Sequence, residues 1–350
     1  MRMFEEQLAR HSFDLLPKQH RDSVREALLT AADGSAVLSL EPVTGGASGA
    51  LVHRVDIRGG RSLLLRIETA RDPFRDPHRS YPCLRTAADA GIAPTVHVAD
   101  ADTGIVVMDF IQQRPIAQYP GGAVGVLREL GALVARLQAT ATFPPLLDFP
   151  ALLAQMLEMI EAAGVFAPGV LGPVHEGFDR IREAYPWERE DPVSSHNDVN
   201  PLNVLFDGDR LWLIDWELAF RNDQFADVAC AANNFADPAA PAGPLEDALL
   251  HAWLGRAPHG PERSRLVLMR QLNRLFYACL MMSTSIGQQP PERDLVALSI
   301  DAFRAEIESG RLALGSPRLL HTMGKMQLAG FLAGFSAEGF DENLRQARSG

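Results

Sequence analysis

The segment SSHNDVNPLNVLFDGDRLWLIDWE, residues 194–217, combines a polar loop with two short apolar runs. The runs NVLF and LWLID are joined by Asp-Gly-Asp-Arg at 207–210, a sequence typical of the turn in a β-hairpin. Asp198 and Asn203 precede or begin the first run, and Asp215 ends the second. Because a hairpin returns the chain to its start, the pattern predicts that these three oxygen-bearing side chains converge at one edge of it.

The spacing of the polar residues matches a loop used in phosphoryl transfer. His196-x-Asp198, with Asn203 five residues after the aspartate, fits the H-x-D-x-x-x-x-N loop of kinase-type enzymes. In that chemistry Asp198 is the general base for a substrate hydroxyl, and Asn203 and Asp215 are oxygen ligands of the kind that Mg²⁺ prefers. We expect His196 to be a buried hydrogen-bonding support for the loop. Plain turn formation by Asp and Asn is the alternative, and the agreement of spacing and hairpin favours catalysis.

The surrounding chain predicts the fold. Alternating and β-branched residues indicate an antiparallel sheet of about five strands, beginning near residue 36 and including 51–57, 62–68, 94–100 and 104–111. Helices are expected within residues 3–32 and at 84–90, and helical spacing dominates from Val126 onward. The pattern predicts an α+β, bilobal protein-kinase-like fold. Its N-terminal lobe covers residues 1–108 and its mainly α-helical C-terminal lobe covers residues 109–350.

A glycine-rich turn lies between the first two predicted strands. Gly45, Gly46, Ser48 and Gly49 could place backbone N–H groups against phosphates, although a turn of this kind is often only a turn. Arg66 lies in the middle of the run LLLRIE. It is either an edge residue reaching solvent or the cation that pairs with the phosphates, and its position after the turn favours the second role.

The run GIVVMDFI is expected to lead from the sheet into the second lobe. Backbone groups from Asp109 to Ile111 are candidates to hydrogen-bond an adenine, and Met108 to line its pocket. Met108 as a plain core residue is nearly as good an interpretation. For Glu217 two roles stay open: contact with a substrate cation, or a solvated surface charge.

Composition limits the partners. The formal charge of −11 and pI near 5.4 provide no basic field for nucleic acid or an anionic membrane. The three cysteines show no C-x-x-C spacing, and no apolar run approaches the ~20 residues of a membrane span. The acidic start of the chain does not match a secretory signal. We therefore expect a cytoplasmic protein, monomeric or homodimeric, whose partner is a small molecule.

The quoted motifs resemble the choline/ethanolamine kinase and aminoglycoside phosphotransferase superfamily, over roughly residues 37–310. HNDVNPLNVL followed by LIDWE is the most specific part, and an arginine at position 66 is similar to choline kinases. The resemblance implies that Asp198 is the base, that Asn203 and Asp215 hold Mg²⁺, and that ATP lies under the glycine turn. It implies transfer of the γ-phosphate to a hydroxyl of a small metabolite, with a choline- or ethanolamine-like amino alcohol favoured.

One helix departs from this family pattern. The stretch HRSYPCL at 78–84 offers no acidic residue to pair with Arg66, and Pro82 is expected to disturb the helix. Glu68, Asp72 and Asp76 are the possible substitutes. The missing acid is the best support for an alternative of another class, a non-catalytic nucleotide-binding scaffold.

Other activities remain as alternatives. An aminoglycoside-type antibiotic or sugar kinase is the nearest, and a polycationic acceptor would require carboxylates such as Asp237, Glu246 and Asp247. A protein kinase would carry a longer activation segment with D-F-G and A-P-E ends. A His/Asp metal hydrolase would require a second histidine at ligand spacing from His196.

Overall fold

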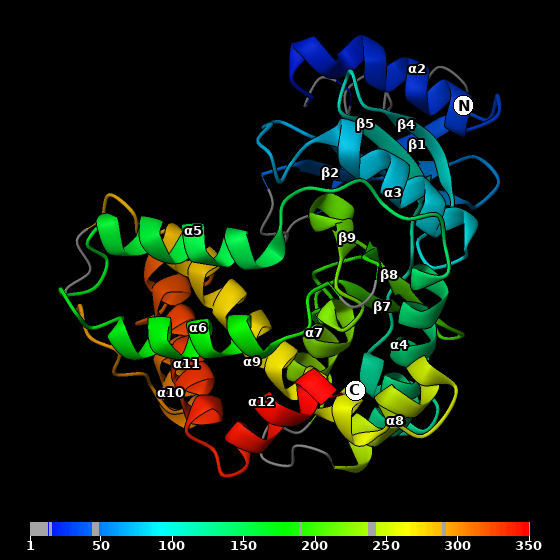
Figure 1. Ribbon diagram of the computed structural model, residues 1–350. Coiled ribbons are helices and arrows are strands. Elements are labelled where there is room, and N and C mark those ends of the chain that lie inside the picture. Colours follow the sequence, from blue (N-terminus) through cyan, green and yellow to red (C-terminus); the bar gives the residue numbers. More distant parts are fainter. Residues whose placement is uncertain are drawn as a thin grey trace. The chain divides into compact units, whose positions relative to one another are not determined.

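The computed structural model describes Phe13 and residues 16–43, 49–188, 191–236, 243–288 and 292–349. Within these limits the chain forms two compact units, shown in Figure 1. The first comprises Met1–Leu146 and Val193–Arg221, and the second comprises Leu147–Pro192 and Asn222–Gly350. The division into lobes at residues 108 and 109 remains a prediction.

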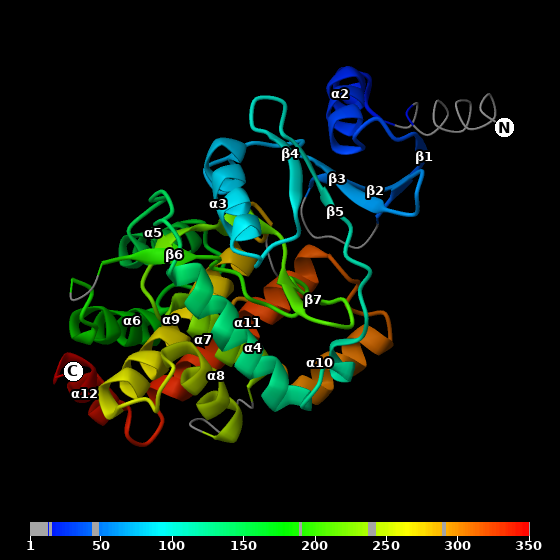
Figure 2. The same cartoon turned by 90° about the vertical axis from the view of Figure 1, so that its right-hand side faces the viewer.

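An antiparallel sheet of five strands dominates the first unit, in the order β1-β2-β3-β5-β4. The strands are β1 (Val37–Pro42), β2 (Leu51–Ile57), β3 (Ser62–Ile67), β4 (Val96–Asp100) and β5 (Ile105–Asp109). This confirms the predicted sheet. The helical turn η1 (Lys18–His20) and helix α2 (Arg21–Ala31) are the described part of the N-terminal helices, and Figure 2 shows α2 beside the sheet.

The two faces of the sheet differ because side chains alternate along each strand. One face forms a core with α2, from Val24, Leu28, Val55, Leu63 and Leu65, each less than 2% exposed. On the other face Arg66 of β3 lies between Val52 of β2 and Val106 of β5. The register thus carries a charged side chain onto the face opposite the α2 core.

Helix α3 (Pro77–Asp89) begins seven residues before the predicted start at residue 84 and continues through Pro82. Asp76 caps it by accepting a hydrogen bond from the His78 N–H at 3.0 Å, and Pro77 occupies the first turn, where its missing N–H costs nothing. The expectation that Pro82 disturbs the helix is wrong. Burial of one face outweighs the local cost of the proline, through Tyr81, Cys83, Leu84 and Ala87.

The remaining elements of the first unit carry the polar loop. Helix α4 (Gly122–Gln138) follows the short turn η2 (Ile116–Gln118), and the later part adds β6 (Val193–Ser195), β7 (Val204–Phe206), β8 (Leu211–Leu213), η3 (Trp216–Leu218) and β9 (Phe220–Asn222). Strands β7 and β8 form the predicted hairpin. Its turn needs Gly208, because φ is +107° and an added Cβ would lie 2.8 Å from Nε of Arg114.

The second unit is helical, as predicted. It contains α5 (Phe149–Ala162), α6 (Gly172–Ala184), α7 (Ala226–Phe235), α8 (Pro244–Leu254), α9 (Gly260–Ser283), α10 (Ile300–Glu308), α11 (Pro317–Phe335) and α12 (Phe340–Ser349). Helix α9 packs against α5, α7, α11 and α12, so the C-terminal segment is a packing element of this unit.

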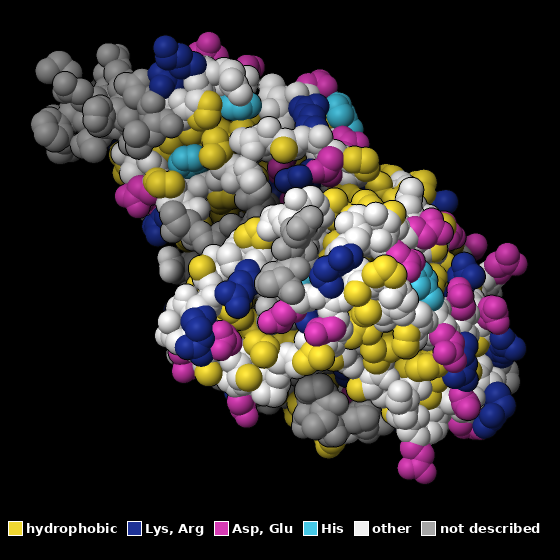
Figure 3. Space-filling model, turned by 90° about the vertical axis from the view of Figure 1, so that its left-hand side faces the viewer, with side chains coloured by type: hydrophobic (Ala, Val, Ile, Leu, Met, Phe, Trp, Pro, Cys, Tyr) yellow, Lys and Arg dark blue, Asp and Glu magenta, His cyan; other side chains and the backbone are white. Residues whose placement is uncertain are grey.

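The surface carries charges of both signs, and the free cysteines lie inside the protein. Figure 3 shows one face, on which Lys and Arg side chains are interspersed with Asp and Glu. None of the helices in the described ranges has both the length and the apolar composition needed to cross a bilayer. Three free cysteines are buried, namely Cys83, Cys230 and Cys279.

Candidate functional site

The polar loop before β7 is supported by a buried histidine. His196 is fully buried; its Nε2 lies 2.9 Å from the carbonyl oxygen of Ile214, and its Nδ1 accepts the Asp198 N–H at 3.3 Å. These contacts favour the tautomer that carries its proton on Nε2. His196 therefore ties the loop to the end of the hairpin, in the supporting role predicted for it.

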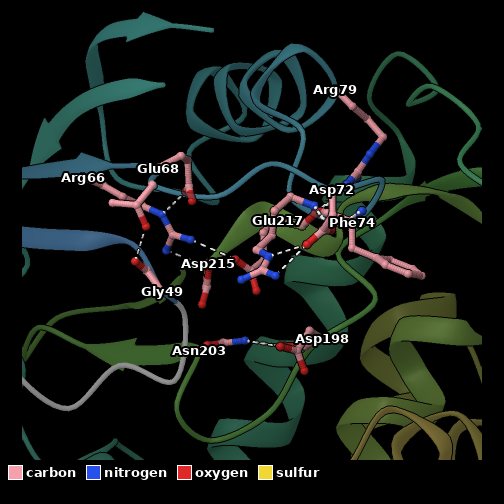
Figure 4. Close-up of polar contacts among 12 residues, drawn as sticks. Gly49, Arg66, Glu68, Asp72, Phe74, Arg79, Asp198, Asn203, Asp215 and Glu217 are labelled. Atoms are coloured by element: carbon pink, nitrogen blue, oxygen red, sulfur yellow. Dashed lines mark hydrogen bonds and ion pairs between the residues drawn. The ribbon is translucent and has the colours of Figure 1, made fainter. Parts of the chain in front are cut away.

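Two asparagines hold the carboxylate of Asp198. Nδ2 of Asn203 donates to Oδ2 of Asp198 at 2.7 Å, and Nδ2 of Asn200 donates to Oδ1 at 2.8 Å; Figure 4 shows the Asn203 contact. Asn200 is itself held, since its Oδ1 accepts the Leu202 N–H at 2.8 Å. Both carboxylate oxygens thus accept a hydrogen bond from a side-chain amide, which fixes the orientation of the group. Asn203 could be predicted from the sequence motif, but Asn200 could not, because the motif leaves its position unspecified.

A second cluster surrounds Arg66 (Figure 4). Its Nε donates to Glu68 at 2.5 Å, and its two terminal nitrogens donate to Asp215 and Glu217, each at 2.9 Å. The Arg66 and Glu68 side chains are only 14% and 8% exposed. Helix α3 offers no acid to pair with Arg66, and Glu68 is the acidic partner instead. Of the other substitutes considered, Asp72 instead pairs with the neighbouring Arg75.

The charges of this cluster do not balance, because three carboxylates share one guanidinium. Burial by itself lowers the pKa of Arg66, but Asp215, Glu68 and Glu217 together raise it, so the guanidinium stays charged. Burial, followed by the nearby Asp215 carboxylate, raises the pKa of Glu217 to about 7 despite its bond to Arg66. Glu217 is thus a half-buried member of the Arg66 cluster and not a solvated surface charge, and its contact with a substrate cation remains a prediction.

Helix α3 holds the segment that follows the hairpin, residues 215–219, through hydrogen bonds. Asp215 has φ 63° and ψ 69°, a left-handed conformation that costs a non-glycine residue about 1–2 kcal/mol. Arg79 of α3, which is 7% exposed, donates to the carbonyl of Glu217 at 2.7 Å and to that of Ala219. No local signal predicted these contacts, which join residues about 140 positions apart.

Of the residues predicted for the glycine turn, the structure describes Gly49. Gly45, Gly46 and Ser48, the predicted phosphate-binding residues, lie outside the described residues. Gly49 is described, and its carbonyl accepts a hydrogen bond from the Thr69 hydroxyl at 2.6 Å. Figure 4 shows Gly49 on the same side of the cluster as Arg66. The end of the turn is therefore fixed next to the strand that carries the predicted phosphate-binding cation.

Of the predicted adenine-binding residues, Met108 and Asp109 end strand β5, and Ile111 lies two residues beyond it. Met108 is 8% exposed and lies opposite Leu64 of β3 in the register, on the face that carries Arg66. The Asp109 N–H donates to Thr95, so it is engaged within the unit. By contrast, the Ile111 N–H makes no hydrogen bond to any residue in the described ranges. A backbone donor at the end of the strand is what an adenine ring nitrogen requires.

The donor set around Asp215 and Asn203 is compatible with Mg²⁺. Because Nδ2 of Asn203 faces Asp198, its Oδ1 is the atom left for a metal, and Arg66 contacts only Oδ1 of Asp215. The described residues contain no group of three or more His, Cys, Asp or Glu side chains arranged to hold a metal. Mg²⁺ does not need one, since it retains waters and shares substrate phosphates with one or two protein oxygens.

Solved structures of small-molecule kinases share this fold. A choline/ethanolamine kinase family protein from Mesorhizobium loti matches with a TM-score of 0.68 and 20% identity, over 94% of this chain and 99% of that one. An ethanolamine kinase from Plasmodium vivax matches with a TM-score of 0.59 and 11% identity, over 94% and 86%. APH(2")-IIa, solved in a ternary complex with streptomycin and ATP, matches with a TM-score of 0.57 and 12% identity, over 77% and 90%.

Sequence comparison points the same way. An uncharacterised protein of Metamycoplasma hominis is 34% identical over 62 residues, a match that spans 17% of this chain and only 12% of that protein. The model of the phosphotransferase enzyme family matches residues 39–266, which include the whole Arg66 cluster and the Asp198 loop. The chain therefore belongs to the phosphotransferase enzyme family.

Proposed function

We propose that this protein transfers the γ-phosphate of ATP, with Mg²⁺, to a hydroxyl of a small amino alcohol of the choline or ethanolamine type. The observation that carries the proposal is the hydrogen-bonded Asp198 carboxylate, held by Asn203 five residues later. Asp198 accepts the hydroxyl proton while the substrate oxygen bonds to the γ-phosphorus. The bond from that phosphorus to the β–γ bridging oxygen breaks, and ADP leaves. Such general-base assistance contributes about 10²- to 10⁴-fold.

The remaining site residues bind and orient the nucleotide. Mg²⁺, held by Asn203 and Asp215, would neutralise charge on the phosphates. Arg66 is the side-chain cation for those phosphates, and the backbone of the turn at Gly45, Gly46 and Ser48 covers them. In the same scheme Met108 lines the adenine pocket, and Asp109 and Ile111 offer it backbone groups. Residues 1–108 then form the nucleotide-binding lobe and residues 109–350 the lobe for metal and acceptor.

The ion pairs of two acidic residues bear on the aminoglycoside alternative. Glu246 and Asp247, which a polycationic antibiotic could use, are paired with Arg270 at 2.5 Å and Arg263 at 2.6 Å, while Asp237 lies outside the described residues. These pairs favour a smaller cationic acceptor over an aminoglycoside.

The scaffold alternative rested on the missing helix acid, and Glu68 supplies a partner for Arg66 instead.

A cytoplasmic location would provide ATP and keep the buried thiols reduced. There the protein would act as a monomer or homodimer.

The test is ligand-dependent stability followed by an acceptor screen. Wild type should gain stability with Mg²⁺ and ATP together, by about 2.7 kcal/mol at a hundredfold excess over the dissociation constant. Asp215→Ala should lose this gain, whereas Asp209→Ala, an exposed residue of the hairpin turn, should keep it. ATP consumption with amino alcohols, sugars and aminoglycosides would then identify the acceptor. A folded wild type that shows no shift at saturating ATP would refute the proposal.

A further inference from the structure

Arg79 occupies the turn of α3 in which the sequence offers no acid for Arg66. It is 7% exposed, and each hydrogen bond that its guanidinium makes to a described residue goes to a backbone carbonyl. One set lies just before the helix, at Pro73 (3.4 Å) and Phe74 (2.6 Å). The other lies after the hairpin, at Glu217 (2.7 Å) and Ala219. A single side chain thus joins two segments that are far apart in the sequence (Figure 4).

The charge of Arg79 has no carboxylate partner among the ion pairs of the described residues. Its Nε is buried with no hydrogen-bond partner there, and burial lowers the pKa of the guanidinium. A buried cation that hydrogen-bonds only to carbonyls, with acidic groups such as Asp76 and Glu217 nearby but not in an ion pair with it, is a poor way to gain stability, because desolvation of the charge is costly. The value of Arg79 must therefore lie in what its planar fork of donors holds in place.

What it holds is the segment that carries two acidic side chains of the site. Asp215 begins this segment in a left-handed conformation, and within the segment the Ala219 N–H closes a turn on Trp216 at 3.1 Å. Arg79 fixes the carbonyls of Glu217 and Ala219, two and four residues after the strained residue. The turn from Trp216 to Ala219 joins Asp215 to these carbonyls, so the backbone at Asp215 belongs to the segment that Arg79 holds.

We propose that Arg79 is a positioning residue that orients Asp215 for the metal by clamping residues 217–219 to helix α3. The role is divided: Glu68, directly after strand β3, pairs with Arg66, and helix α3 contributes a cation that binds carbonyls where an acid would have bound Arg66. The inference rests on the proposed function for its link to the metal.

The test measures metal binding without turnover. Mn²⁺ replaces Mg²⁺, a non-hydrolysable ATP analogue is present, and the free Mn²⁺ signal in electron paramagnetic resonance gives the dissociation constant. Arg79→Met should weaken Mn²⁺ binding by about 10- to 100-fold, the effect typical of residues that orient metal ligands. Arg79→Lys, which keeps the charge and loses the fork, should lie in between. Arg61→Met is the matched control, since Arg61 also donates to a carbonyl, that of Ala31 at 2.6 Å; its Mn²⁺ affinity should equal that of wild type.

The outcomes separate the two claims. Wild-type binding with an unchanged constant in Arg79→Met, whatever its melting temperature, would overturn the positioning role and leave the proposed function intact. Absence of Mn²⁺ binding in wild type would overturn the proposed function, and this inference with it. If Arg79→Met does not fold, Arg79→Lys decides by the same constant, and an affinity equal to wild type would overturn the inference.

Discussion

Replacing Arg66 by methionine should destabilise the protein far more than replacing Arg54, a strand arginine on the same face of the sheet. The Arg66 guanidinium is 14% exposed and separates three carboxylates at 2.5, 2.9 and 2.9 Å. Without it, Glu68 is left 8% exposed and unneutralised beside Asp215 and Glu217. Removing one partner of a buried ion pair costs about 3–5 kcal/mol. Because Asp215 and Glu217 retain about a quarter of their exposure, we expect a loss near the lower limit, about 3 kcal/mol.

Urea unfolding followed by circular dichroism at pH 8 measures this loss. Arg54→Met is the matched control: its pair with Asp56 is 37% and 32% exposed, so its removal should cost less than about 1 kcal/mol. Adding Glu68→Gln to Arg66→Met should recover part of the loss, since it removes the buried uncompensated charge. Equal losses in the two arginine variants, or no recovery in the double variant, would refute the electrostatic explanation.

Three further predictions follow from individual contacts. Asn200→Ala removes one charge-assisted hydrogen bond to Asp198, worth about 1.5–3 kcal/mol, so kcat for ATP consumption should fall about 10- to 150-fold with little change in KM for ATP. In Asp56, hydrogen bonding by Ser62 lowers the carboxyl pKa in the folded state, so its stabilisation is present above the usual pKa and is lost as pH falls through the lowered value. The stability gap between wild type and Asp56→Asn in urea titrations should therefore be open at pH 6 and close at strongly acidic pH. Gly208→Ala should lower the melting temperature, because the alanine backbone would be held at a φ of +107° and its methyl group would press against the Arg114 side chain.

Each of these predictions has a control and a contrary result. Asn234→Ala removes an asparagine contact within helix α7, to the carbonyl of Cys230, and should leave kcat unchanged; a raised KM with unchanged kcat in Asn200→Ala would contradict the orienting role. For Asp56, a gap that does not vary with pH would contradict the linkage. Gly59 has nearly the same φ as Gly208, +106°, but open space around it. Gly59→Ala should therefore cost less, and an equal cost would remove the argument from close packing.

Sequence patterns predicted correctly the elements that depend on residues close together in the chain. The hairpin at β7 and β8 could be predicted from an Asp-Gly turn between apolar runs, and the convergence of Asp198 and Asn203 follows from their place in one loop. The start of α3 could not be predicted in this way. Pro82 has a low helix propensity, and only the burial of one helix face outweighs that cost. Arg79 was missed for a similar reason, since its acceptors lie in a segment about 140 residues away.

Glu68 shows an intermediate case. Its position two residues after Arg66 made it one of three candidates, but proximity in sequence could not separate it from Asp72 and Asp76. The structure separates them by geometry: Glu68 reaches the guanidinium, Asp72 pairs with Arg75, and Asp76 caps α3. Pairing within a crowded charge cluster depends on side-chain directions, which a pattern of residue types does not contain.

The three buried cysteines allow transient unfolding of the protein to be measured by the rate at which their thiols are labelled. Thiol reagents attack the thiolate, and burial raises the pKa of Cys83 and of Cys279 to about 12, so the native state should react very slowly. Labelling under native conditions would then time transient exposure, with Cys83 reporting on the first unit and Cys230 and Cys279 on the second. The same protection would let a single cysteine introduced on the surface carry a fluorophore selectively, with the native thiols left in place.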